Sequence, residues 1–113
     1  MWRRGNKYHA KKKEVDGIVF DSKKEAEYYL TLCWMQKAGL VVKIERQVAF
    51  ELQPSFKYKG KTERAIKYMA DFVVTYKDGH TEVVDVKGMR TRDYVMKRKL
   101  LLYKNPELDF KEV

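Results

Sequence analysis

Residues 68–88 read YMADFVVTYKDGHTEVVDVKG, and this stretch predicts two short strands joined by a tight turn. Both strands are mostly apolar, yet they carry Asp71, Asp85 and Lys87. Charged side chains in buried strands are costly unless they are paired or bind a metal ion. The three residues therefore predict a functional site, and the alternative is that they belong to a solvated strand face.

The length of the loop decides whether the two aspartates can meet. A two-residue loop at Asp78-Gly79 would point Asp71 and Asp85 to opposite faces, because side chains alternate along a strand. A three-residue loop over 77–79, with its glycine in the left-handed conformation, places Asp71 opposite Asp85. We adopt this second register. It predicts β-carbons about 5 Å apart, with Lys87 on the same face about 6.5 Å further on.

Two carboxylates at this separation repel each other unless a cation lies between them. An all-oxygen ligand set suits Mg²⁺ or Mn²⁺, which polarises a phosphate and activates a bound water. A neighbouring lysine can stabilise charge on the phosphate. Zinc is not expected, since Cys33 is the single cysteine and His9 and His80 form no cluster with it.

The composition indicates a small basic domain. The chain has 113 residues, with 25 Lys and Arg against 16 Asp and Glu, which gives a net charge of +9. This surplus favours a polyanionic partner such as DNA, although a basic domain without such a partner is the alternative. We expect one domain over 1–113 with a basic N-terminal arm over about 1–13, no membrane span and a cytoplasmic location in a reducing compartment.

The periodicity of apolar residues predicts an α+β (α/β) fold in which helices pack on a mixed sheet. The expected order is helix, strand, strand, strand, helix, strand, preceded by a small hairpin around Asp16-Gly17. The helices are expected over 22–38 and 92–104, and strands over 40–53, on both sides of the 77–79 loop, and near 108–113.

The first helix offers two apolar sides. One side is the expected buried stripe, and the other could belong to the core or form a dimer face. The stripe comprises Ala26, Tyr29, Leu30, Cys33 and Trp34, and the second side comprises Tyr28, Leu32 and Met35.

At this point the sequence resembles the PD-(D/E)xK nuclease superfamily, which includes restriction endonucleases and Holliday-junction resolvases. The resemblance rests on DGIVFDSKKEAEYY, ERQVAFEL, YMADFVV and EVVDVKG, and is closest to small phage and prophage proteins. It implies a restriction-endonuclease-like core in which Asp71 and the acid-x-lysine Asp85-Val86-Lys87 form the site. Met69-Ala70 replaces the proline of the family name, and Asp85 replaces the commoner glutamate.

The resemblance also implies a role for Glu25 in metal binding and catalysis. The residues alone favour a simpler role, because Glu25 follows Ser22 by three positions and could close a capping box. Gln47 is a candidate for the edge of the site, and packing or surface exposure would explain it equally well.

Basic residues near the N-terminus and at the second expected helix are expected to hold DNA through its phosphates. We expect a metal-dependent endonuclease that selects branched or junction DNA in phage recombination or replication. A homodimer is one arrangement that would suit two cuts in such DNA. The alternatives are a non-catalytic DNA-binding protein that retains the fold, and an assembly factor with a basic surface. The expected DNA-binding residues are Arg3, Arg4, Lys11, Lys12, Lys13, Arg90, Arg92, Lys97, Arg98 and Lys99.

Overall fold

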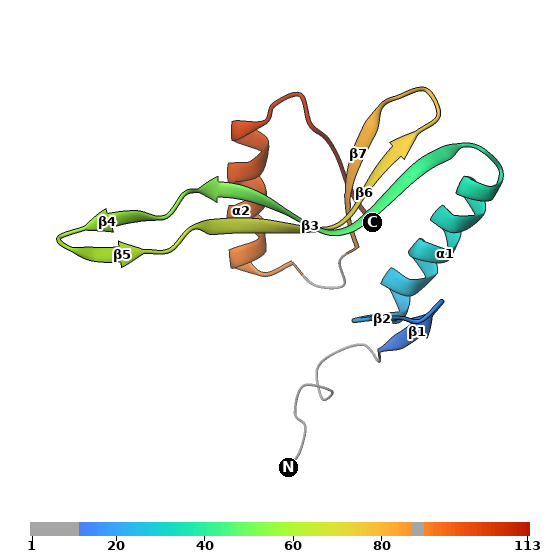
Figure 1. Ribbon diagram of the computed structural model, residues 1–113, viewed down its shortest axis with the longest axis horizontal. Coiled ribbons are helices and arrows are strands. Elements are labelled where there is room, and N and C mark those ends of the chain that lie inside the picture. Colours follow the sequence, from blue (N-terminus) through green and yellow to red (C-terminus); the bar gives the residue numbers. More distant parts are fainter. Residues whose placement is uncertain (1–11, 87–89) are drawn as a thin grey trace, which may run out of the picture.

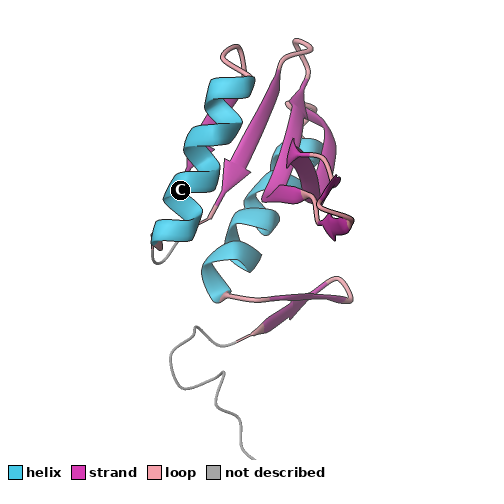
Figure 2. Ribbon diagram, turned by 90° about the vertical axis from the view of Figure 1, so that its left-hand side faces the viewer, coloured by secondary structure: helices cyan, strands magenta, loops and turns pink. Residues whose placement is uncertain are grey.

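The computed structural model describes residues 12–86 and 90–113 and shows two helices with a mixed sheet (Figures 1 and 2). The order of the main elements and the coarse α+β class agree with the prediction. In chain order the elements are β1 (Lys13–Val15), β2 (Ile18–Phe20), α1 (Lys23–Lys37), β3 (Val41–Gln53), β4 (Phe56–Tyr58), β5 (Lys61–Glu63), β6 (Ile66–Tyr76), β7 (Thr81–Asp85), α2 (Arg92–Lys104) and β8 (Asp109–Glu112).

The main sheet has four strands in the order β3-β6-β7-β8. The pairs β3–β6 and β6–β7 are antiparallel, whereas β7 and β8 are parallel. The parallel pair requires a crossover connection, and α2 provides it. Two further pairs, β1–β2 and β4–β5, form separate two-stranded ribbons.

The helices pack against two different hydrophobic clusters. The α1 cluster contains Phe20, Ala26, Leu32, Val41, Phe72, Val74, Val84 and Val86. The α2 cluster contains Leu52, Tyr68, Ala70, Val73, Val83, Tyr94 and Leu101. Strands β6 and β7 contribute to both clusters, so they are covered on both faces and read as nearly continuous apolar runs.

Local signals set the ends of α1. The Ser22 hydroxyl accepts from the N–H of Glu25 at 3.1 Å, which satisfies one of the free donors of the first turn. At the other end, Gly39 has a φ of +84°. The N–H of Leu40 donates to the carbonyl of Met35, and that of Gly39 to Gln36, which is the Schellman arrangement.

The buried side of α1 differs from the predicted stripe. Ala26 is buried, but Leu30 is 36% exposed and Trp34 is 73% exposed. Tyr29 of the predicted stripe does pack against the α1 cluster, but so do Tyr28 and Met35, and Leu32 is buried at 1% exposure. The second apolar side therefore belongs to the core. It does not form the dimer face considered as its alternative.

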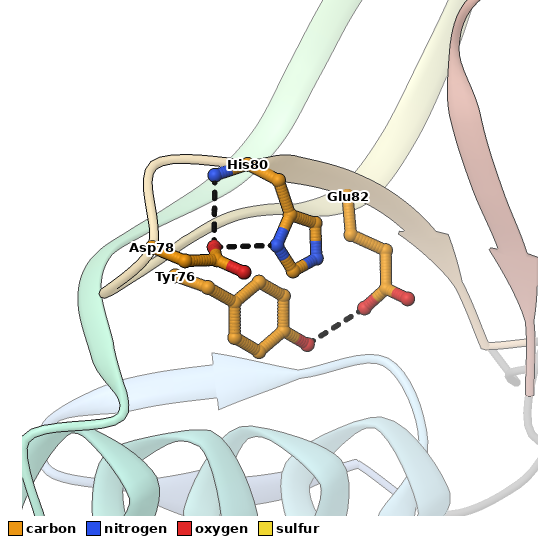
Figure 3. Close-up of polar contacts among 4 residues, drawn as sticks. All are labelled: Tyr76, Asp78, His80 and Glu82. Carbon is orange, nitrogen blue, oxygen red and sulfur yellow. Dashed lines mark hydrogen bonds and ion pairs between the residues drawn. The ribbon is translucent and has the colours of Figure 1, made fainter.

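The turn between β6 and β7 has three residues, as predicted (Figure 3). The N–H of Tyr76 donates to the carbonyl of His80 at 2.9 Å, and Gly79, with a φ of +96°, donates to the carbonyl of Tyr76. The Asp78 carboxylate accepts from the backbone N–H of His80, and this bond lowers the pKa of Asp78. The ring of His80 stacks on Tyr76, whose hydroxyl donates to Glu82 at 2.7 Å.

This turn sets the register of the whole hairpin. The pairs run from Thr75 opposite Thr81 to Phe72 opposite Val84. Continued by one residue, the register places Asp71 opposite Asp85, which confirms the predicted alignment. A two-residue loop would have shifted the register and turned the aspartates apart.

The two smaller ribbons both have two-residue turns with positive φ. Asp16 and Gly17 have φ of 52° and 80°, which confirms the predicted hairpin. Lys59 and Gly60 have φ of 50° and 80° and join β4 to β5. The paired strands on either side of this second turn were not predicted from the sequence.

Candidate functional site

Asp71 and Asp85 lie at the point where the pairing of β6 with β7 ends. The N–H of Asp71 donates to Oδ1 of Asp85 at 3.2 Å, and the N–H of Val86 donates to Oδ2 of Asp71 at 2.8 Å. The Asp85 side chain is fully buried and also accepts from the hydroxyl of Tyr68. Each carboxylate therefore accepts a hydrogen bond from a backbone N–H on the other side of the hairpin. These bonds lie beyond the last regular pair of the two strands, Phe72 and Val84.

Strands β3 and β6 change face at this same level. Ala70 belongs to the α2 cluster, whereas Phe72, two residues later, belongs to the α1 cluster. Regular alternation would keep both on one face. Opposite them, Gln47 has a φ of 51° in the middle of β3, and the flanking pairs place it across from Asp71. The left-handed residue reverses the alternation and leaves Asp71 at the crossing between the two faces.

Glu25 comes to the site from the first turn of α1. Its side chain is 5% exposed, and its Oε2 accepts from Nε2 of Gln47 at 3.4 Å. The backbone of Glu25 donates to the N-cap Ser22, so one half of the predicted capping box is present. Gln47, the residue considered for the edge of the site, makes this contact and is otherwise exposed, so surface exposure remains open as its explanation.

The environment of Glu25 disfavours its charged form. The pKa of Glu25 is raised to about 7, mainly by burial and then by the charges of Asp71 and Asp21. Arg46 lowers the pKa, and Asp85 makes a smaller contribution that raises it. The negative charges of β6 and β7 thus act directly on the helix carboxylate. The site has an excess of negative charge that a cation would relieve.

The carboxylates do not surround a common point. Within residues 12–86 and 90–113, no three His, Cys, Asp or Glu side chains are grouped closely enough to hold a metal ion. Asp71 and Asp85 are turned toward the backbone donors described above. The predicted Lys87 lies outside the described residues.

The predicted basic residues around α2 have different surroundings. A pocket of about 380 Å³ at the start of the helix is lined by Arg90, Thr91, Arg92, Val95, Met96 and Lys99. Arg90 Nε lies 3.3 Å from the Glu112 carboxylate, which also accepts from the Tyr94 hydroxyl. The side chains of Arg92 and Lys99 are exposed, so these residues are the strongest candidates for phosphate contact.

Two other basic residues of α2 make contacts within the fold. Arg98 is half-buried, with its guanidinium 5.3 Å from the centre of the Phe110 ring. Lys97 Nζ lies 3.5 Å from the carboxylate of Asp93, which is on the preceding turn of α2. At the N-terminal end Lys12 and Lys13 are exposed. Arg3, Arg4 and Lys11 lie outside the described residues.

Comparison with known proteins gives a family. Residues 5–113 match the model of the family described as "Protein of unknown function (DUF1064)". The chain belongs to this family. No curated protein matches the chain. Because the description of DUF1064 gives no activity, the function of this member has to be argued from its site. Nor does any described helix of this DUF1064 protein have the length and apolar character needed to cross a membrane.

One site residue of this DUF1064 protein was missed by the sequence analysis. Tyr68 precedes Asp71 by three positions, so in a regular strand their side chains would lie on opposite faces. The change of face at Asp71 brings Tyr68 to the carboxylate of Asp85. No local pattern marks this contact, because it depends on the positive φ of Gln47 on the neighbouring strand.

Proposed function

We propose that this protein is a metal-dependent DNA endonuclease that hydrolyses phosphodiester bonds, with a core like that of the PD-(D/E)xK nucleases. The observation that carries the proposal is the electrostatic interaction of Glu25 in α1 with Asp71 in β6 and Asp85 in β7. Burial raises the pKa of Glu25 first, and the charges of Asp71 and, to a smaller extent, Asp85 add to it. A buried carboxyl group with a raised pKa beside other carboxylates is typical of catalytic sites.

The donor set suits Mg²⁺ or Mn²⁺, since all three side chains offer carboxylate oxygens. The ion would polarise the scissile phosphate and supply an activated water. Asp71 and Asp85 would hold it, with Glu25 as a third ligand, and each aspartate would exchange its backbone donor for the ion. Lys87 is proposed to stabilise the negative charge that develops on the phosphate.

The basic surface at the start of α2 supports DNA as the substrate. Arg92 and Lys99 are exposed and line a pocket together with Val95 and Met96. Lysine and arginine contacts to phosphates position a duplex without reading its sequence. We therefore propose cutting that depends on DNA structure, as in a resolvase, within a phage or prophage. A homodimer would place two sites on a symmetric junction.

A cleavage panel tests the proposal. Purified protein is incubated with labelled linear, flap and four-way DNA in the presence of Mg²⁺, Mn²⁺ or EDTA. We expect cutting with either metal and none in EDTA. Asp85→Ala should abolish cutting while DNA binding persists, and Asp109→Ala, at an exposed position in β8, is the matched control.

The second candidate function is a DNA-binding protein without catalysis. It is favoured by the engagement of both aspartates with backbone N–H groups, and by the absence of a grouped metal site among the described residues. Binding of DNA without cutting in either metal would support this alternative. Loss of both binding and cutting at low salt would favour an assembly factor whose basic surface meets an acidic protein.

A further inference from the structure

The β4–β5 ribbon extends away from the helices and the main sheet, as Figure 1 shows. Its side chains are all exposed from Pro54 to Arg64. The ribbon continues the β3–β6 pair, because Gln53 opposite Ile66 and Tyr58 opposite Lys61 belong to one register. We name residues 54–65 the arm.

The arm is strongly basic and carries exposed aromatic rings. Residues 54–65 contain four cationic side chains and a single acidic one, Glu63. Phe56 is 47% exposed and Tyr58 is 58% exposed, and they share one face of β4 because they are two residues apart. The cationic residues are Lys57, Lys59, Lys61 and Arg64.

Two large rings on a ribbon without a covering layer are not explained by packing. A two-stranded ribbon gains little stability in water from its own side chains. Exposed aromatic residues among cations are, in contrast, the combination that binds unpaired nucleic acid. The cations neutralise phosphates, and the rings stack on bases of any sequence.

We propose that the arm recognises the unpaired bases of branched DNA, with Phe56 and Tyr58 as stacking platforms and the lysines as phosphate contacts. This inference rests on the proposed function for its substrate and names the element that selects branched structure. Charge complementarity favours DNA over an acidic protein, because the cations follow both strands of the ribbon and not one patch.

The geometry of the ribbon sets its distance from the proposed site. Asp71 in β6 comes ten residues after Lys61 in β5. At a strand rise of 3.3 Å per residue this corresponds to about 33 Å along the extended chain. One turn of duplex DNA is about 34 Å. The arm could therefore contact a branch about one helical turn from the scissile phosphate. Its base is anchored on α2, since Lys104 Nζ donates to the carbonyl of Leu52 at 2.7 Å.

The test measures binding in EDTA, so that it does not require cleavage. Fluorescence anisotropy with a flap DNA, whose branch is single-stranded, and with a linear duplex compares the wild-type chain with Phe56→Ser/Tyr58→Ser. We expect a loss of flap affinity of about tenfold or more, because both stacking rings are removed, and a change below about twofold for the linear duplex. Equal losses on both DNAs, or none on either, would overturn the inference.

The lysines are tested by a second variant, Lys57→Gln/Lys59→Gln/Lys61→Gln. The slope of log affinity against log salt should fall in magnitude by about 0.9 for each phosphate that the variant no longer neutralises. The matched control removes three exposed lysines at the opposite end of the sheet and should keep the slope within about 0.9 of the wild-type value. An equal slope for both triple variants would contradict the inference. The control is Lys37→Gln/Lys43→Gln/Lys77→Gln.

A third variant removes the arm and leaves intact the β3–β6 pair from which it extends. Gln53 faces Ile66, so residues 54–65 can be replaced by Asn-Gly, which closes a two-residue turn. This variant should fold, bind linear DNA through α2 and lose the preference for flap DNA. An unchanged preference for flap DNA would refute the arm's role, even if the protein cuts DNA. If removal of the arm abolishes the preference for flap DNA and the wild-type protein cuts no substrate, the role of the arm is supported and the proposed catalysis is rejected.

Discussion

Substitution of Glu25 by glutamine should make the protein more stable at alkaline pH. The Glu25 carboxyl has a pKa of about 7 in the folded protein, against an ordinary value of 4.5. The folded state therefore holds this proton more tightly than the unfolded state. Stability from this group is complete below pH 4.5 and is lost as the pH rises toward and beyond 7.

The size of the effect follows from the difference in pKa. A difference of about 2.5, at 1.36 kcal/mol for each pKa unit, corresponds to about 3 kcal/mol once Glu25 is fully charged. Glutamine carries no charge at any pH, keeps an oxygen that can accept from Gln47, and can remain at this position of a capping box. Glu25→Gln should therefore avoid the loss of folding stability that the charged carboxylate causes at alkaline pH.

The assay is urea unfolding of the wild-type protein and Glu25→Gln in EDTA between pH 4 and pH 9. The gain in free energy of unfolding should be near zero at pH 4, grow between 4.5 and 7, and level off above that. Glu27→Gln, at an exposed position on the same helix, should show no such profile. A gain for Glu25→Gln that is constant with pH would refute the electrostatic account of the site.

The neighbouring charge can be tested in the same way. Asp71 is the largest electrostatic cause of the raised pKa of Glu25, after burial. Asp71→Asn retains an oxygen that can accept from the N–H of Val86 and removes the charge. In this background the gain from Glu25→Gln should be smaller and its rise should shift to lower pH. Equal gains in both backgrounds would show that the two carboxyl groups do not interact.

Three further predictions concern the fold, all measured by urea unfolding at pH 7. Leu101→Ala should cost about 2–5 kcal/mol because the side chain is fully buried, whereas Leu100→Ala, at 42% exposure, should cost less than about 0.5 kcal/mol. Gly79→Ala should cost about 1–2 kcal/mol because its φ of +96° is unfavourable for alanine, and an unchanged midpoint would contradict the turn geometry. Tyr68→Phe should cost about 1–3 kcal/mol by removing a donor from the buried Asp85, and a neutral result would show that this bond does not stabilise the fold.

The sequence predicted the hairpin register because the decisive information is local. Asp78-Gly79 supplies the residue that tolerates positive φ, and the alternation of the flanking residues then determines which side chains face each other. The ends of both helices were also local, since Ser22 and Thr91 accept from the first-turn N–H groups. These features need no knowledge of distant residues.

The buried face of α1 could not be predicted in this way. Both of its sides carry apolar residues, so periodicity alone permits either to be buried. Packing against Phe20, Phe72 and Val84 selects the side with Leu32 and exposes Trp34 to 73%. The choice depends on strands that are separated from the helix in sequence.

The sequence by itself determined the identity of the acidic residues and the register that sets Asp71 against Asp85. Only the tertiary structure decided how they are held. Gln47, which has a positive φ, lies opposite Asp71. At this level β3 and β6 change face and the hydroxyl of Tyr68 reaches Asp85. Burial beside these charges then raises the pKa of Glu25. Register follows from residues next to each other in the chain, whereas burial and charge follow from strands and helices that meet only in the folded protein.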